Sequence, residues 1–181
     1  MTDQVIIVLY DPDWPRLFSS LGNALRAAMR ETALRIDHIG STAVPGLDAK
    51  PIIDVQISVA DLEPLDGYRL PLEGLGFVWR ANNPDLTKRY FREKPGECRT
   101  HIHVRRLGSW AEQVALLFRD YMRVHPLDAR RYAELKYRLA QEYRDDRLAY
   151  TESKSVFVWE IMALADKWSQ EVGWQPGPTD A

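Results

Sequence analysis

Residues 38–59 constrain the fold of this chain more than any other stretch of its sequence. Within them, Ile53, Val55, Ile57 and Val59 alternate with Asp54, Gln56 and Ser58. This period of two predicts a β-strand with one apolar and one polar face. Residues 35–39 are predicted to form a second strand just upstream, and Gly40-Ser41 is predicted to make a tight turn after it.

The polar side of this stretch indicates a binding site. A carboxylate with apolar neighbours on its strand, such as Asp54, is costly to desolvate unless it meets a cation or lines a wet cleft. The Gly40-Ser41 turn can offer backbone N–H groups and a hydroxyl to an anion. A metal-binding carboxylate beside a phosphate-binding turn is the combination that nucleotidyl transfer requires.

The same stretch resembles the signature of the GrpB family, a branch of the nucleotidyltransferase superfamily whose domain also occurs fused to dephospho-CoA kinase. The superfamily pattern is matched by Ile39-Gly40-Ser41 and, after a gap, by Asp54-Val55-Gln56-Ile57. It departs at Gln56, a neutral amide where the second metal-binding carboxylate usually stands, so the carboxylate set is incomplete. The segment 118–121 and the pair Tyr132 and Lys136 also resemble the helical half of the family.

The resemblance implies an α/β (α+β) fold, with a small mixed β-sheet of the nucleotidyltransferase type, packed helices and a C-terminal helical bundle that closes the cleft. We expect residues 1–108 to form the α/β core, 109–172 the helical bundle and 173–181 a flexible tail. Periodicity predicts a first helix that Asp13 caps, that runs to about residue 31, and whose apolar stripe includes Leu17. It also predicts a helix over 62–74 interrupted near Pro71, a strand at 77–80, and a hairpin of 90–93 with 101–105.

Three helices are predicted in the bundle, over about 109–125, 127–143 and 148–172. The first begins with the capping-box spacing of Ser109 and Glu112, and its apolar stripe includes Trp110. Lys136 and Lys154 each lie within an apolar helix face, where a lysine either extends to solvent or points at an anion in a cleft.

The site residues follow from these patterns together with the resemblance. Asp54 is the expected metal ligand, Mg²⁺ the expected ion, and pairing with an arginine the alternative for this carboxylate. His101 and His103 share one strand face and are open as metal ligands, a proton shuttle or polar residues on a half-wet strand. His103 or Gln56 would position the metal or the acceptor. The expected catalytic residues are therefore Asp54, Gln56 and His103. The expected nucleotide- or phosphate-binding residues are Gly40, Ser41, Thr42, Lys50, Arg119, Tyr132, Lys136 and Lys154.

Two main functions remain open at this point. One is a nucleotidyltransferase that uses a nucleoside triphosphate, Mg²⁺ and a small acceptor. The other is a catalytically degenerate module that binds a nucleotide or phosphorylated metabolite, with a link to CoA precursors through the fused relatives. A zinc-dependent hydrolase based on His101 and His103 is a third reading. The sequence does not identify the acceptor, the preferred base or the oligomeric state.

Composition narrows the partners and the compartment. A formal net charge of −2 gives no basic footprint for long nucleic acid, and no apolar run is long enough to span a bilayer. The single cysteine, Cys98, excludes an internal disulfide and fits a reducing compartment. We therefore expect a cytoplasmic protein with small-molecule ligands.

Overall fold

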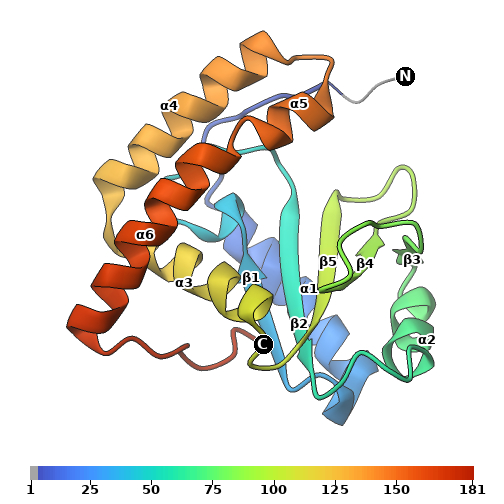
Figure 1. Ribbon diagram of the computed structural model, residues 1–181. Coiled ribbons are helices and arrows are strands. Elements are labelled where there is room, and N and C mark those ends of the chain that lie inside the picture. The colour runs from blue at the N-terminus through green and yellow to red at the C-terminus, as the bar shows by residue number, and fades with distance from the viewer. Residues whose placement is uncertain (1–3) are drawn as a thin grey trace.

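The computed structural model describes residues 4–181, and its centre is a five-stranded mixed sheet (Figure 1). The strand order is β1-β2-β5-β4-β3, with β2 and β5 parallel and all other neighbours antiparallel. The strands are β1 (Arg35–Ile39), β2 (Ile53–Val59), β3 (Val78–Trp79), β4 (Arg89–Arg92) and β5 (Thr100–Arg106). The predicted small mixed sheet and the predicted hairpin are both confirmed.

The register of β2 against β5 brings the polar residues of the two strands together. Asp54 lies opposite His101, Gln56 opposite His103 and Ser58 opposite Arg105. Because side chains alternate across a strand, all six lie on the same face of the sheet. The opposite face is apolar and carries Ile53, Val55, Ile57, Ile102 and Val104, each at most 3% exposed.

Helices α1 (Trp14–Met29) and α2 (Asp66–Gly74) cover the apolar face. The buried stripe of α1 is formed by Trp14, Phe18, Leu25 and Met29, whereas Leu17 is 37% exposed. The predicted stripe is therefore rotated, because the two larger aromatic side chains occupy the sheet-facing side of the first turns.

Two local predictions about these helices are wrong. Asp13 does not cap α1, since its carboxylate instead accepts hydrogen bonds from Arg16. Pro71 does not interrupt α2, which runs through it.

The C-terminal half contains α3 (Trp110–Val124), α4 (Pro126–Glu142), α5 (Arg147–Glu152) and α6 (Ser155–Val172). In Figure 1, α4 and α6 lie on one side of the sheet and the short α5 lies across the upper ends of β2 and β5. The single helix predicted over 148–172 is wrong, because the chain turns between α5 and α6 at 153–154, where the sequence has no glycine or proline to mark a break. Across residues 4–181, no helix is long and apolar enough to cross a membrane.

The start of α3 is as predicted, but the reason differs. Ser109 makes no capping hydrogen bond. Glu112 is buried, and its carboxylate accepts hydrogen bonds from the Ser58 hydroxyl at 2.9 Å and from the Gly108 N–H at 3.1 Å. The glutamate thus joins α3 to the polar face of the sheet. Trp110 is 73% exposed and lies outside the buried stripe predicted to contain it.

The segment 174–181, predicted to be a flexible tail, instead packs along the outer edge of β1. The Asp180 carboxylate accepts the His38 N–H at 2.9 Å, the Thr179 hydroxyl accepts the Ile36 N–H at 2.9 Å, and the Asp180 N–H donates to the Ile36 carbonyl at 3.1 Å. An edge strand leaves backbone groups unpaired, and this segment satisfies them.

We expect Asp180→Ala to lower the free energy of unfolding by about 1–3 kcal/mol. The substitution removes an acceptor from the His38 N–H and from the guanidinium of Arg119, which is 3% exposed and lies 2.8 Å from the Asp180 carboxylate. Urea denaturation measures the change. The exposed Asp145→Ala, at the turn before α5, is the control and should change stability by less than about 0.5 kcal/mol. Equal curves for the two variants would contradict the assigned role of the tail.

Candidate functional site

A cavity of about 290 Å³ lies where β2 and β5 begin, between the sheet, α4 and α5. The parts of the chain that line it include the turn after β1, the loop before β2 and the first residues of β2 and β5 (Figure 1). The predicted site residues among its lining are Gly40, Ser41, Thr42, Lys50, Asp54, His101, Tyr132, Lys136 and Lys154. Residues far apart in the sequence are thus brought to one place.

The turn after β1 passes directly against the carboxylate of Asp54. Gly40 has φ 71° and ψ −170°, a conformation that non-glycine residues rarely adopt. A Cβ at this position would lie 2.7 Å from Oδ2 of Asp54. Glycine therefore allows the turn η2 (Ser41–Ala43) to approach the carboxylate.

The Thr42 side chain holds this turn in place through hydrogen bonds. Its hydroxyl donates to the Ile52 carbonyl at 3.0 Å and lies 3.0 Å from Nε2 of His38. The His38 ring is buried and stacks on Phe18 with 4.7 Å between ring centroids. Burial lowers the pKa of His38 to about 4, so the ring is a neutral core residue that supports the turn.

Asp54 lies between two histidines of β5. Its Oδ1 is 3.1 Å from Nδ1 of His101 and 3.4 Å from Nε2 of His103. The Tyr90 ring lies against both imidazoles, with centroid distances of 5.5 and 5.3 Å. Burial opposes ionisation of Asp54, but the two histidine contacts outweigh it and hold its pKa well below the usual range. Burial lowers the pKa of His103 to about 4, so a carboxylate faces a neutral imidazole at neutral pH.

Three lysines enclose the other side of the cavity. The ammonium groups of Lys50 and Lys154 lie over the Tyr150 ring, 4.9 and 4.5 Å from its centroid, and that of Lys136 lies 4.7 Å from the Tyr132 centroid. Lys136 also donates to the backbone carbonyl of Asp48. Between residues 4 and 181, no carboxylate comes within ion-pair distance of these three ammonium groups. Lys136 is buried and Lys50 and Lys154 are half-buried, and such a cluster of cations without ion-pair partners is suited to binding an anion.

The pKa values of these lysines show how strongly the cavity disfavours their charge. Burial, with the positive charge of Lys154 added, lowers the pKa of Lys136 to about 7, and burial lowers those of Lys50 and Lys154 to about 8. Because the unfolded chain holds these protons more tightly, stability without ligand should rise with pH from about 7 towards the ordinary lysine value. A bound polyanion would restore the charged forms.

We therefore expect anion affinity to fall as pH rises from 7.5 to 9.5. Phosphate esters are already ionised in this window, so the change reports on the lysines, which must regain protons to bind. The slope should approach tenfold per pH unit for each lysine deprotonated in the free protein, which is about one lysine at pH 7.5 and nearly all three at pH 9.5. Calorimetric titration with a nucleoside triphosphate at several pH values measures it. A flat profile would contradict the role of the lysines.

Three predicted site residues do not line the cavity: His103, which lies next to the lining residue Asp54, and Arg119 and Gln56, which lie away from it. Arg119 is 3% exposed, its guanidinium is paired with Asp120 and Asp180, and it donates to the His38 carbonyl at 3.1 Å. Arg119 therefore links β1 to the C-terminal tail. It is not positioned to bind a phosphate in the cavity, as the sequence had suggested.

Gln56 is fully buried within the polar face of the sheet. Its amide donates to the Glu112 carbonyl at 3.2 Å and accepts a hydrogen bond from Arg105. These contacts occupy both ends of the amide. Gln56 therefore connects β2 to β5 and α3, and its amide is not free to position a metal or an acceptor as expected.

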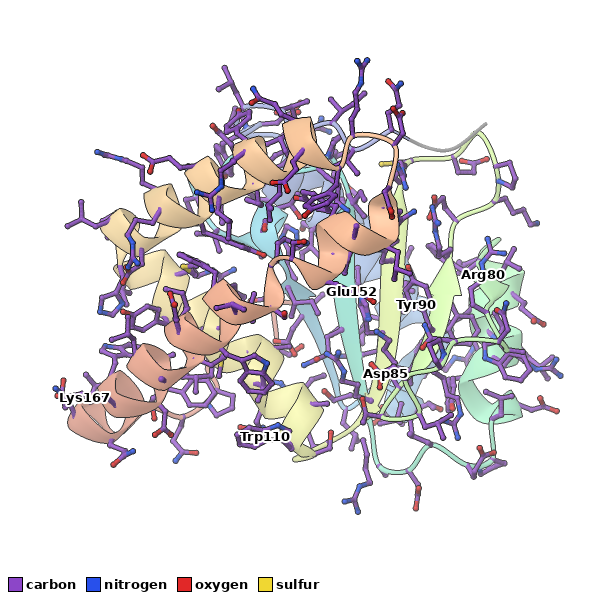
Figure 2. The ribbon with its side chains drawn as sticks, turned by 45° about the horizontal axis from the view of Figure 1, so that its top comes forward. Arg80, Asp85, Tyr90, Trp110, Glu152 and Lys167 are labelled. Atoms are coloured by element: carbon purple, nitrogen blue, oxygen red, sulfur yellow. The ribbon has the colours of Figure 1, made fainter. Side chains whose placement is uncertain are left out.

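The sequence analysis did not assign the part of the cavity that α5 supplies. Arg147, Tyr150 and Thr151 line it together with Lys154. Tyr150 and Thr151 lie three and four residues after Arg147 on α5, so these three share one helix face, and Lys154 follows in the turn before α6. That spacing was the signal available in the sequence. Figure 2 labels Glu152 on α5 and Tyr90 on β4.

The residues around Asp54 fit Mg²⁺ only in part. Asp54, His101 and His103 can each offer one ligand atom, and these atoms lie within 4.8 Å of one another. Mg²⁺ prefers oxygen ligands and often uses one or two carboxylates with phosphate oxygens and water, a role that Asp54 alone can fill. The two imidazole nitrogens do not fit that preference.

Comparisons with known proteins cover almost the whole chain. The family model described as GrpB protein matches residues 4–164. The UPF0157 protein PA4798 of Pseudomonas aeruginosa is 43% identical over 167 residues, which cover 90% of this chain and 68% of that protein. A protein of Mycolicibacterium paratuberculosis named dephospho-CoA kinase is 32% identical over 199 residues, covering 95% of this chain and 48% of the kinase, so the chain spans about half of that relative.

A solved structure has the same fold. The crystal structure of conserved protein GrpB from Enterococcus faecalis superposes with a TM-score of 0.83 at 33% sequence identity. The match covers 91% of this chain and 99% of that one. The mixed sheet and the helical C-terminal region are therefore shared with an experimentally determined structure.

Proposed function

Because this chain belongs to the GrpB family, we propose that its cavity binds a nucleoside triphosphate with a divalent cation and that the protein transfers a nucleotidyl group to a small acceptor. The observation that carries the proposal is the convergence of Lys50, Lys136 and Lys154 on a cavity whose far wall is the Asp54 carboxylate. Cations for phosphates beside a carboxylate for a metal ion are the elements that phosphoryl-type transfer needs.

Each group has a defined part in this proposal. The three lysines neutralise the phosphates, and the turn at Gly40-Ser41 contributes backbone N–H groups. Asp54 would hold the cation, for which Mg²⁺ is the ion that the superfamily resemblance implies. A bound cation would neutralise charge on the transferred group. His103 lies 3.4 Å from the Asp54 carboxylate and would orient the acceptor or the cation.

A second candidate is a module that binds a phosphorylated ligand without turning it over. Asp54 is the one acid among the described residues that line the cavity, whereas two-metal transfer uses several carboxylates. The relative named dephospho-CoA kinase makes nucleotide-containing CoA precursors a ligand class for this candidate. Stabilisation by nucleotide that needs no metal, without pyrophosphate release, would favour it, and metal-dependent stabilisation with release would favour the enzyme.

The binding part of the proposal is tested by the double variant Lys136→Met and Lys154→Met. Hydrogen bonds to charged groups contribute about 1.5–3 kcal/mol each, so loss of both ammonium groups should weaken nucleotide binding at least about 100-fold. The variant should also fold at least as stably as the parent at neutral pH, because methionine removes two desolvated charges. Calorimetry and thermal unfolding measure both effects.

Lys167→Met is the matched control, since Lys167 lies exposed at the far end of α6 (Figure 2). It loses the same charge and should bind nucleotide as the parent does. Equal affinity in the double variant and this control would overturn the assignment of the cavity as the phosphate site.

A further inference from the structure

The arrangement of Asp54, His101 and His103 is set by two adjacent parallel strands. The pairing of β2 with β5 places Asp54 opposite His101, and His103 follows two residues later on the same face. Both imidazoles direct a nitrogen at the same carboxylate oxygen, at 3.1 and 3.4 Å. Strands hold side chains more precisely than loops do, so this cluster is preorganised.

The spacing of two of the three atom pairs, from the Asp54 carboxylate to each imidazole, matches that of ligands around a small metal ion, and all three atoms lie within 4.8 Å of one another. Two atoms bonded to one ion at about 2.0–2.1 Å with tetrahedral geometry lie about 3.3 Å apart. The two distances from Asp54 to the histidine nitrogens fall on either side of that value. The Tyr90 ring against both imidazoles and the turn at Gly40 against the carboxylate limit their movement.

The chemistry of the donors distinguishes between metal ions. Two imidazole nitrogens with one carboxylate are typical ligands of first-row transition metals, whereas Mg²⁺ and Ca²⁺ select oxygen. Three protein ligands also leave coordination positions open to substrate or water, as catalytic zinc sites do.

We propose that Asp54, His101 and His103 form a site for a first-row transition-metal dication of the Zn²⁺ or Co²⁺ type, in preference to Mg²⁺. The proposal deepens the function above and depends on it only for the position of the metal beside the phosphate cavity. A phosphate oxygen of the nucleotide would then occupy an open coordination position of the metal. Gln56, bound to Arg105 and Glu112, takes no part.

The test uses the full chain, freed of metal with a chelator and dialysed. Co²⁺ titration should produce the visible absorption of a site with nitrogen and oxygen ligands, at a ratio of one ion per chain. Zn²⁺ at micromolar concentration should raise the melting temperature, and Mg²⁺ at a concentration about 100-fold higher should not. Both measurements are independent of any enzymatic activity.

The double variant His101→Asn and His103→Asn should weaken Co²⁺ binding by more than the roughly 10–100-fold that loss of an outer-shell partner costs. His125→Asn is the control, since its ring bonds the Tyr121 carbonyl away from the cavity and asparagine is accepted at the start of α4. Far-UV circular dichroism checks that both variants fold, and the single His103→Asn variant replaces the double one if it does not.

The outcomes separate this inference from the proposed function. Stabilisation by Mg²⁺ equal to that by Zn²⁺, or Co²⁺ binding unchanged in the histidine variants, would overturn the inference and leave the proposed function standing. Zn²⁺ binding that depends on the histidines, combined with no binding of nucleotide to the lysine cavity, would support the metal site and overturn the nucleotide proposal.

Discussion

Asp54→Asn is expected to abolish metal-dependent pyrophosphate release from a nucleoside triphosphate, with a loss in kcat of at least about 10³-fold, or about 4 kcal/mol of transition-state stabilisation. Asparagine keeps the size of the side chain and can still accept from the histidines, but it is a much weaker ligand for a cation. Since Asp54 lies between His101 and His103 at the cavity wall, no other described acid is placed to substitute for it. A continuous pyrophosphate assay measures the loss.

Asp48→Asn is the matched control for that experiment. Asp48 lies beside the cavity, where its carboxylate accepts from the Tyr10 N–H at 2.9 Å and from the Tyr137 hydroxyl at 3.1 Å. It loses the same charge near the lysines without touching the proposed cation site, so turnover should change by less than about tenfold. If Asp54→Asn retained the turnover of the parent, Asp54 would have no part in the reaction.

Gly40→Ala is expected to lower the free energy of unfolding by about 2–5 kcal/mol. The backbone at Gly40 lies in a region that is nearly restricted to glycine, and the new methyl group would lie 2.7 Å from Oδ2 of Asp54. Either the turn or the carboxylate must move, so binding of metal and nucleotide should weaken together with stability. Urea denaturation and calorimetry at matched temperature measure the two effects.

Gly46→Ala separates the two causes of that effect. Gly46 also has a positive φ, 75°, but a Cβ there would meet no atom within 4 Å. It should therefore show only the backbone cost, about 1 kcal/mol, with normal ligand binding. If Gly40→Ala and Gly46→Ala lowered the free energy of unfolding equally, the contact between the turn and Asp54 would make no contribution of its own.

Local patterns in the sequence predicted much of the fold and part of the site. The alternation in 53–59 and the turn at Gly40-Ser41 after residues 35–39 predicted the first two strands, because a period of two and a positive φ are properties of a few consecutive residues. The polar faces of β2 and β5 also follow from alternation. The parallel pairing and the register that place Asp54 opposite His101 were decided by the tertiary structure.

Contacts between distant segments decided the remaining features. Three polar side chains are of types usually found in binding sites or on surfaces, yet each is buried and bonded to partners far away in the sequence: Arg119, Gln56 and Glu112. The tail at 174–181 contains Pro176, Gly177 and Pro178, which are typical of disorder, but the open edge of β1 supplies hydrogen bonds that order it.

The sequence by itself therefore determined the strands, most of the helices and which residues are chemically able to bind a phosphate or a metal, since these depend on residue type and local spacing. The tertiary structure alone decided which of them meet. Whether a charge is exposed, paired or directed into a cavity depends on packing between α5, α4 and the ends of β2 and β5. No local pattern specifies that packing.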